Sequence, residues 1–203
     1  MSFDETAREV GSTVDRRIRR LQSLSEHPRR AALANLRRGV GRAPGELPEL
    51  WGSFLADMPE EFFGRGGAPS EAEWAVYLAL TLYALHQQGQ TRPMCVQEEG
   101  LGRAVRRLSA DPEGGVYRRF CALVTAGGME EISHHLRGLI QLLRDKSLPL
   151  DYPQLARDLY RLQFPQSAPG VKLQWGQEYF SRKDADGQQE DSDDRQEKED
   201  TDE

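Results

Sequence analysis

The segment from Glu71 to Gln87 constrains the fold of this 203-residue chain more than any other. It is apolar nearly all round at helical spacing, and a helix that is hydrophobic on every face has to be buried. Ser70-Glu71-Ala72-Glu73 matches a capping box, in which the serine and the glutamate three positions later each satisfy a free backbone N–H. We therefore expect a central helix over 71–87, ended by Gly89, with other elements packed around it.

The rest of the N-terminal half also has a helical pattern. Apolar residues recur at steps of three and four from Phe3 to Leu21, the stripe of an amphipathic helix. Pro28 fits the first position of a second helix, and Gly39 fits its end. A short third helix, including Trp51, is expected over 47–58. The aromatic residues lie mostly on apolar stripes, which favours core positions for them.

The C-terminal half repeats this pattern, and no segment alternates with a period of two over the length of a strand. Apolar stripes predict helices over 101–109, 116–124 and 132–144, a helix capped by Asp151 that continues to 162, and a last helix over 171–182. We therefore predict an all-α protein of two packed helical bundles. The N-terminal bundle spans 1–90, a linker spans 91–99, and the C-terminal bundle spans 100–183.

Residues 184–203 differ sharply from the rest of the chain. They contain 11 acids and 2 bases and no Val, Ile, Leu, Phe, Tyr or Trp, so they offer nothing to offset the entropy of ordering. We predict a disordered acidic C-terminal tail, which either keeps the protein soluble or shields a basic surface from unspecific nucleic acid. Without it the net charge changes from −6 to +3, because 25 bases then face 22 acids.

Arginine makes up 23 of the 27 basic residues, and it recurs in doublets on the predicted helices. The guanidinium group is permanently charged and binds phosphate through two hydrogen bonds at once. On the 101–109 helix, Arg103, Arg106 and Arg107 form one patch off the apolar stripe. Such outward patches are typical of proteins that bind a nucleic-acid backbone. A GC-rich genome, in which Arg replaces Lys throughout, is an alternative explanation of the count alone.

Motifs of catalysis are missing from the sequence. There is no P-loop, dinucleotide-binding glycine motif, HExxH or GxSxG. Glu130 and Glu131 precede His134 at helical spacing, but surface salt bridges explain them better than a metal site. Cys121 is expected to be a buried apolar group. We predict no enzyme activity, metal or cofactor. With no secretory signal and no apolar run of transmembrane length, we expect a soluble cytoplasmic protein.

Three groups of segments, in their order and spacing, resemble the CasB family, the small subunit of the type I-E CRISPR Cascade surveillance complex. They are Ala32–Gly39 followed by Leu50-Trp51; Gly102–Leu108 followed by Tyr117–Phe120; and Leu150–Leu159 followed by Leu173–Gly176. The resemblance spans roughly Arg16 to Phe180 and implies a non-catalytic all-helical subunit. It also implies other Cascade subunits and a head-to-tail second copy as protein partners. The implied nucleic-acid partners are CRISPR RNA and target DNA, including the displaced strand, with no membrane contact.

The matching basic positions of that family imply backbone-binding residues, to which the outward patches add Arg106 and Arg144. The predicted nucleic-acid-binding residues are Arg37, Arg38, Arg103, Arg106, Arg107, Arg118, Arg119, Arg137 and Arg144. Arg157 also matches, but a salt bridge to Asp151 or Asp158 is an equal alternative for it. A helical protein–protein adaptor without nucleic-acid contact is the alternative function.

Overall fold

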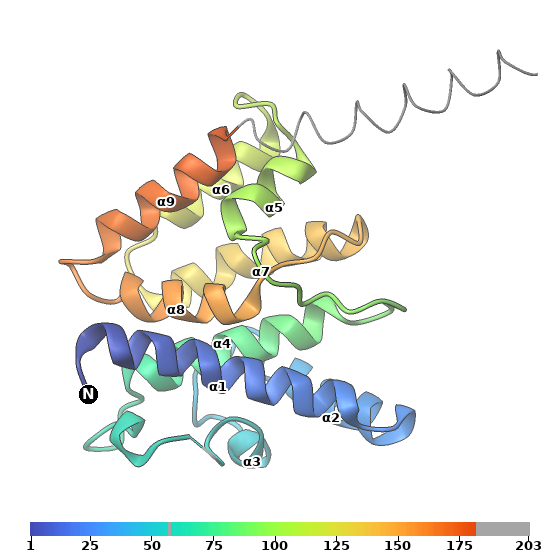
Figure 1. The fold of residues 1–203 in the computed structure, drawn as a ribbon, viewed down its shortest axis with the longest axis vertical. Helices are drawn as coiled ribbons and strands as arrows, with labels where there is room; N and C mark the ends of the chain where they lie inside the picture. The colour runs from blue at the N-terminus through green and yellow to red at the C-terminus, as the bar shows by residue number, and fades with distance from the viewer. Residues whose placement is uncertain (57, 182–203) are drawn as a thin grey trace, which may run out of the picture.

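The computed structural model describes residues 1–56 and 58–181, and within these residues the regular structure is helical, with no strand. The α-helices are α1 (Phe3–Ser23), α2 (Glu26–Arg37), α3 (Trp51–Phe54), α4 (Glu71–His86), α5 (Leu101–Leu108), α6 (Gly115–Thr125), α7 (Met129–Asp145), α8 (Tyr152–Leu162) and α9 (Ala168–Phe180), with 3₁₀ turns at Pro48–Leu50 and Glu60–Phe62 (Figure 1). The all-α prediction is confirmed. The predicted disordered tail, 184–203, lies outside the described residues.

Helix α4 is the buried centre that its sequence predicts. The Ser70 hydroxyl accepts the Glu73 N–H at 3.0 Å, and the Glu73 carboxylate accepts the Ser70 N–H at 2.7 Å, which completes the capping box. Every residue from Ala75 to His86 is buried. The helix packs against α1, α2, α7 and α8, so each of its faces meets another helix. An all-round apolar helix is stable in water only with such cover.

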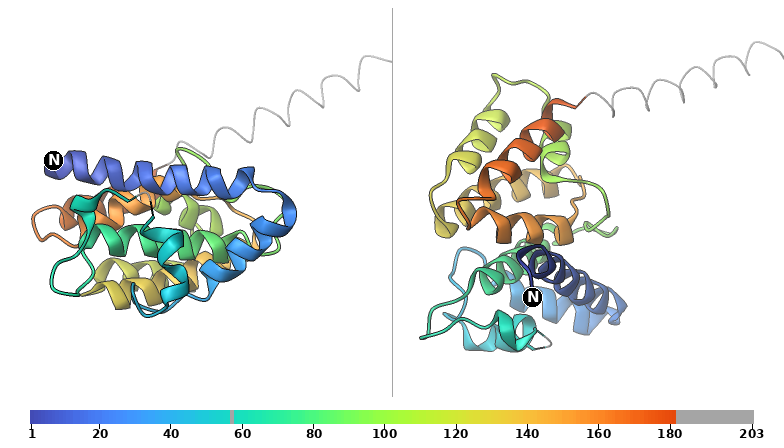
Figure 2. Two further views of the ribbon diagram at one scale, coloured as in Figure 1. Left: turned by 90° about the horizontal axis from the view of Figure 1, so that it is seen from below. Right: turned by 60° about the vertical axis from the view of Figure 1, so that its left-hand side comes forward.

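The helices form two packed groups, α1–α4 and α5–α9, that meet in the middle of the molecule (Figure 2). Figure 1 shows α2 and α3 at one end, α1 and α4 next to them, then α7 and α8, and finally α5, α6 and α9 at the other end. In the left view of Figure 2, α1 and α7 lie on opposite sides of α4. Helix α8 joins the groups, because it packs on α1 and α4 as well as on α9. One continuous apolar core results.

The segment predicted as a linker is attached to the start of α8. The Leu150 N–H donates to the Met94 carbonyl at 3.1 Å, and the Val96 N–H donates to the Leu150 carbonyl at 3.2 Å. Asp151 caps α8 as predicted, since one carboxylate oxygen accepts the Gln154 N–H at 2.8 Å. Its other oxygen accepts a backbone N–H of the same segment, that of Glu98, at 3.0 Å. These bonds hold residues 94–99 against the junction of the two helical groups.

Two buried polar pairs connect α8 to its neighbouring helices, one at the contact with α9 (the α8–α9 junction) and one at the contact with α4. The Asp158 carboxylate accepts the indole N–H of Trp175 at 2.8 Å and an amide N–H of Gln154 at 2.7 Å, linking α8 to α9. Burial nevertheless raises the pKa of Asp158 to about 6. The His86 Nδ1 lies 3.0 Å from the Tyr152 hydroxyl, linking α4 to α8. Burial lowers the pKa of His86 to about 4, so this imidazole is neutral at pH 7.

The structure corrects three details of the predicted helices. Helix α2 begins at Glu26, and Pro28 lies within its first turn, where a missing N–H costs nothing. The helix predicted over 47–58 is only a 3₁₀ turn followed by the four residues of α3. Trp51 at its start is 48% exposed, so its predicted core position is wrong.

Within the described residues, no helix combines the length and apolar character needed to span a membrane.

Candidate nucleic-acid interface

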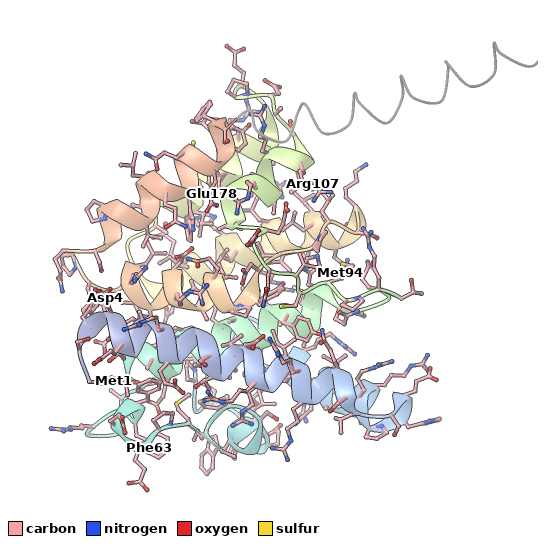
Figure 3. All side chains as sticks on the ribbon, viewed as in Figure 1. Met1, Asp4, Phe63, Met94, Arg107 and Glu178 are labelled. Carbon is pink, nitrogen blue, oxygen red and sulfur yellow. The ribbon has the colours of Figure 1, made fainter. Side chains whose placement is uncertain are left out.

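The predicted arginines on α5 are largely engaged by neighbouring groups. The Arg107 guanidinium lies 3.3 Å from the Glu99 carboxylate, and Arg107 is labelled on α5 in Figure 3. Arg106 is half-buried and donates to the Tyr179 carbonyl at 3.0 Å. Arg103 donates to the Glu98 carbonyl. The prediction that they form one outward patch therefore holds only in part, since Arg106 points toward α9.

The predicted arginines of α6 and α7 have fewer protein partners. Arg118 donates to the Glu113 carbonyl at 2.7 Å. Arg119 and Arg137 are exposed, and neither forms an ion pair with a described residue. The Arg119 guanidinium lies 4.0 Å from the position that a Cβ would take on Gly138 of α7. The Arg119 side chain therefore extends to α7, the helix that carries Arg137.

Arg137 also connects α7 to the end of α2. Its guanidinium lies 3.6 Å from the position that a Cβ would take on Gly41, in the loop that follows α2. Within the same region, Arg38 forms an exposed ion pair with Glu49 at 2.6 Å. Arg144, at the end of α7, pairs with the adjacent Asp145 at 2.9 Å.

A cavity of about 800 Å³ lies between α2 and the segment 87–93, and we call it the α2 groove. Its charged lining residues are Arg29, Arg30, Arg37, Arg92 and Glu26. Leu33 and Tyr83 add apolar surface, and the remaining polar side chains include the amides of several glutamines. Four guanidinium groups therefore share the groove with a single carboxylate.

The one carboxylate of the α2 groove does not neutralise it. Glu26 pairs with Arg30 at 2.7 Å, one turn along α2. Arg92 donates to a neutral group, the Ser147 carbonyl. Arg37 is half-buried, and its burial lowers the pKa of the guanidinium without a carboxylate to oppose the effect. A charge that has lost part of its hydration without gaining a counterion is unfavourable, and an anion beside it would reduce that cost.

A second cavity, of about 460 Å³, has a different charge balance. It lies between α1, α5, α8 and α9. Its charged lining residues are Arg8, Arg103, Arg157, Asp15, Glu98, Asp151 and Glu178. Three guanidinium groups thus face four carboxylates, so this cavity is no anion site. The Arg157 guanidinium binds the Gln154 amide oxygen at 2.6 and 3.1 Å, and the salt bridge considered for it does not form.

The nine predicted arginines come from the end of α2, from α5, from α6 and from α7. Those of α5 lie on a helix that packs against α9, whereas Arg119 is on α6 and Arg137 on α7, and these two helices pack against each other. Of the nine, only Arg37 lines the α2 groove. The prediction omitted Arg29 and Arg30, although they form a visible doublet after Pro28. Arg92 carries no sequence signal, because it stands alone in the predicted linker.

The residues considered for metal binding or reactivity have ordinary surroundings. Glu131 lies 3.8 Å from the Nε2 of His135, not His134, an arrangement that fits surface salt bridging. In the part of the chain that the structure describes, no three His, Cys, Asp or Glu side chains gather in a group that could hold a metal ion. Cys121 is half-buried, not buried as predicted.

The sequence and the fold of this chain are similar to those of known proteins. A sequence model of the CRISPR-associated protein Cse2 matches residues 32–180. The crystal structure of CasB from Thermobifida fusca is 36% identical, with a TM-score of 0.69, over 85% of this chain and 98% of that one. A CRISPR-associated protein of the Cse2 family from Thermus thermophilus is 28% identical, with a TM-score of 0.64, over 84% and 97%. CasB from M. ruber is 25% identical, with a TM-score of 0.60, over 83% and 92%. No curated protein matches.

Proposed function

This chain belongs to the CRISPR-associated Cse2 family, to whose CasB structures it is similar, and we propose that it is a non-catalytic structural subunit of a CRISPR RNA-guided surveillance complex. In this role it binds the sugar–phosphate backbone of nucleic acid and stabilises the R-loop, including the displaced strand. Exchanging a DNA duplex for an RNA–DNA heteroduplex is nearly balanced in free energy, so modest contacts to the backbone are sufficient to shift it.

The α2 groove is the observation that carries this proposal. Its four guanidinium groups face one carboxylate, and Arg37 lacks a counterion within the described structure. Phosphate oxygens match the fork of the guanidinium, and backbone contacts carry no sequence information. The groove therefore supports binding of a polyanion of any sequence.

Arg119 and Arg137 supply a second, shallower contact region. They are exposed, and Arg137 reaches the loop after α2, next to the helix that forms one wall of the groove. A strand that leaves the groove past the end of α2 would meet Arg137. Six further predicted arginines stay part of the proposal, but each guanidinium group already has a hydrogen bond or ion pair within the chain, which a phosphate would have to share or replace. They are Arg38, Arg103, Arg106, Arg107, Arg118 and Arg144.

The proposal is tested by fluorescence anisotropy of labelled single-stranded DNA, duplex DNA and heteroduplex with the full chain, between about 50 and 200 mM salt. The groove variant combines Arg29→Gln, Arg37→Gln and Arg92→Gln. We expect weaker binding to every sequence and a salt slope shallower by roughly 2 to 3, since about 0.7 to 0.9 is lost per phosphate contact. Arg65→Gln, at an exposed arginine outside the groove, controls for the loss of one surface charge, so the groove variant must lose more than three times its effect on the logarithm of the affinity.

The α5–α6 residues are tested separately. A variant with Arg103, Arg107, Arg118 and Arg119 changed to Ala is expected to weaken binding at all sequences and to keep its helicity in circular dichroism. Unchanged binding by that variant would remove these four residues from the interface. If the wild-type chain binds none of the nucleic acids at low salt but associates tightly with a protein subunit, the alternative of a protein–protein adaptor is correct.

Exposed apolar residues at the two ends support contacts with other subunits or with a second copy. Trp51 and Phe63 are 48% and 42% exposed, and Figure 3 shows Phe63 at the end of the molecule opposite α9. Leu173 and Phe180, two turns apart on α9, are 63% and 56% exposed. Different apolar patches at opposite ends fit a head-to-tail contact, in which one patch of each copy meets the other patch of the next.

A further inference from the structure

The acidic residues 184–203 have no role in the proposed function, and the α2 groove has unneutralised positive charge. We propose that this acidic segment binds in the α2 groove of its own chain and competes there with the nucleic-acid backbone. The inference rests on the proposed function in one respect only, namely that the groove is also the nucleic-acid site. Binding of the segment to the groove is a separate physical claim.

Charge complementarity is the first argument. The segment carries 11 carboxylates and 2 basic groups, and the groove carries four guanidinium groups and one carboxylate that is already paired. Carboxylates accept two parallel hydrogen bonds from an arginine, as phosphates do. A carboxylate beside Arg37 would supply the counterion that this half-buried guanidinium lacks among the described residues.

The length of the chain permits this contact. Helix α9 ends at Phe180, and 22 residues follow Ser181. A chain of that length spans at most about 75 Å. A compact domain of the size described has a radius of gyration of about 16 Å. The more distal acidic residues are therefore able to reach the groove, although α9 and α2 lie toward opposite ends of the molecule (Figure 1).

The α2 groove is a better site than the arginines closest to the end of α9. Arg106 lies there, but it is occupied by the Tyr179 carbonyl. Arg107 is paired with Glu99. Asp111 and Glu113 are exposed between α5 and α6, and they repel further carboxylates. The groove combines a cavity, an excess of guanidinium groups and a half-buried cation, and the α5–α6 region has none of these together.

Binding within one chain gives this weak contact a measurable effect. A tethered segment is present at an effective concentration in the millimolar range. Short or isolated strands then compete poorly with it, whereas a nucleic acid held in place by other subunits displaces it. The acidic segment would thus reduce unspecific binding by the free subunit and have little effect in an assembled complex.

The test compares the full wild-type chain with a full-length variant in which every Asp of 184–203 is changed to Asn and every Glu to Gln. In NMR spectra without nucleic acid, we expect the Nε–Hε signals of Arg29 and Arg37 to differ between the two chains, and the signal of Arg65 to stay unchanged. In anisotropy measurements with single-stranded DNA at low salt, we expect the neutralised chain to bind about 10-fold tighter.

Long-range repulsion between the segment and DNA predicts some gain in affinity without any docking. The same neutralisation is therefore repeated in the groove variant Arg29→Gln, Arg37→Gln, Arg92→Gln. If the acidic segment docks, the gain in affinity for single-stranded DNA should fall below about 3-fold in the groove variant. In that variant the segment has no groove site from which DNA must displace it. An equal gain in both backgrounds would overturn the inference.

The NMR comparison separates this inference from the proposed function. Groove signals that do not change on neutralisation contradict docking, whatever the affinity for DNA. Groove signals that do change, in a chain that binds no nucleic acid, support docking and contradict the proposed function.

Discussion

The α8–α9 junction and the α2 groove both place polar side chains against apolar surface. The two regions differ in whether these side chains find partners within the chain. At the junction, Asp158 accepts hydrogen bonds from Trp175 and Gln154, all within the chain. In the groove, Arg37 loses water and gains no counterion from the described residues. A satisfied buried group contributes to stability and is closed to ligands, whereas a half-buried cation without a counterion leaves that interaction to a partner.

Mutations in the two regions should have different consequences. Changes at the junction should lower the free energy of unfolding, and changes in the groove should leave it nearly constant and reduce binding. A mutation that does both, or a groove mutation that unfolds the protein, would break the distinction.

Trp175→Ala is expected to have the largest effect. Trp175 is fully buried and its indole N–H is a partner of Asp158, so its removal leaves a cavity and a carboxylate with one donor fewer. The expected loss of unfolding free energy is about 3 to 5 kcal/mol, measured by urea denaturation followed by circular dichroism. Trp51→Ala, at a tryptophan that is 48% exposed, is the control and should cost less than about 1 kcal/mol. Similar losses for both would show that the junction is not a stability centre.

The pH dependence of stability provides the next largest effect. The folded state raises the pKa of Asp158 from 3.8 to about 6, so its contribution is full below pH 3.8 and is lost as the pH rises through about 6. The folded state lowers the pKa of His86 from 6.5 to about 4, so its contribution is full above pH 6.5 and is lost as the pH falls through about 4. Each of the two pKa differences corresponds to about 3 kcal/mol of unfolding free energy. In the wild-type chain their opposite effects on the pH dependence of stability cancel between about pH 4 and 6.

Single variants should reveal the two opposite slopes. As the pH falls from about 7 to 4, the unfolding free energy of Asp158→Asn should fall by about 3 kcal/mol relative to that of wild type. The reason is that only the His86 contribution then changes. His86→Asn should gain a similar amount over the same range. Urea denaturation of the three chains at about pH 4, 5.5 and 7 measures this. Parallel curves for wild type and Asp158→Asn would show that Asp158 is ionised in the folded protein across the range.

The groove variant Arg29→Gln, Arg37→Gln, Arg92→Gln should behave in the opposite manner. We expect its unfolding free energy to stay within about 1 kcal/mol of wild type, because these guanidinium groups have few partners to lose. Its affinity for single-stranded DNA should fall by about 10-fold or more at low salt. Thermal denaturation and fluorescence anisotropy on the same preparation give both values.

The smallest effect is expected at a surface ion pair outside both regions. Arg38 and Glu49 lie 2.6 Å apart, but their side chains are 61% and 37% exposed. Exposed pairs of this kind contribute about 0 to 1 kcal/mol. Glu49→Gln should therefore change stability by less than about 0.5 kcal/mol, and a larger loss in urea denaturation would show that this pair has a structural role.

Local patterns predicted the helices because each depends on nearby residues. The capping box at Ser70 and Glu73, the cap at Asp151 and the apolar stripes all act within a turn or two of helix. The region of Trp51 was the exception. The predicted helix breaks there into a 3₁₀ turn and a single turn of α3, and the indole faces solvent.

The candidate site was less predictable for a physical reason. Whether an arginine is available depends on the carboxylates and carbonyls that the fold brings to it, often from distant parts of the chain. Arg106 is occupied by a carbonyl 73 residues away, and Arg107 by Glu99. Arg92 joins Arg29 and Arg37 only because the segment after α4 folds back along α2.

The sequence by itself determined the all-α class, the buried central helix, the capped starts of α4 and α8, the acidic character of residues 184–203 and the resemblance to the CasB family. All of these follow from the order of side chains along the chain. Only the tertiary structure decided which guanidinium groups have counterions and which do not. That balance depends on distances across the fold, and it separates Arg107 of α5, which has the Glu99 carboxylate as a counterion, from Arg37 of the α2 groove, which has none among the described residues.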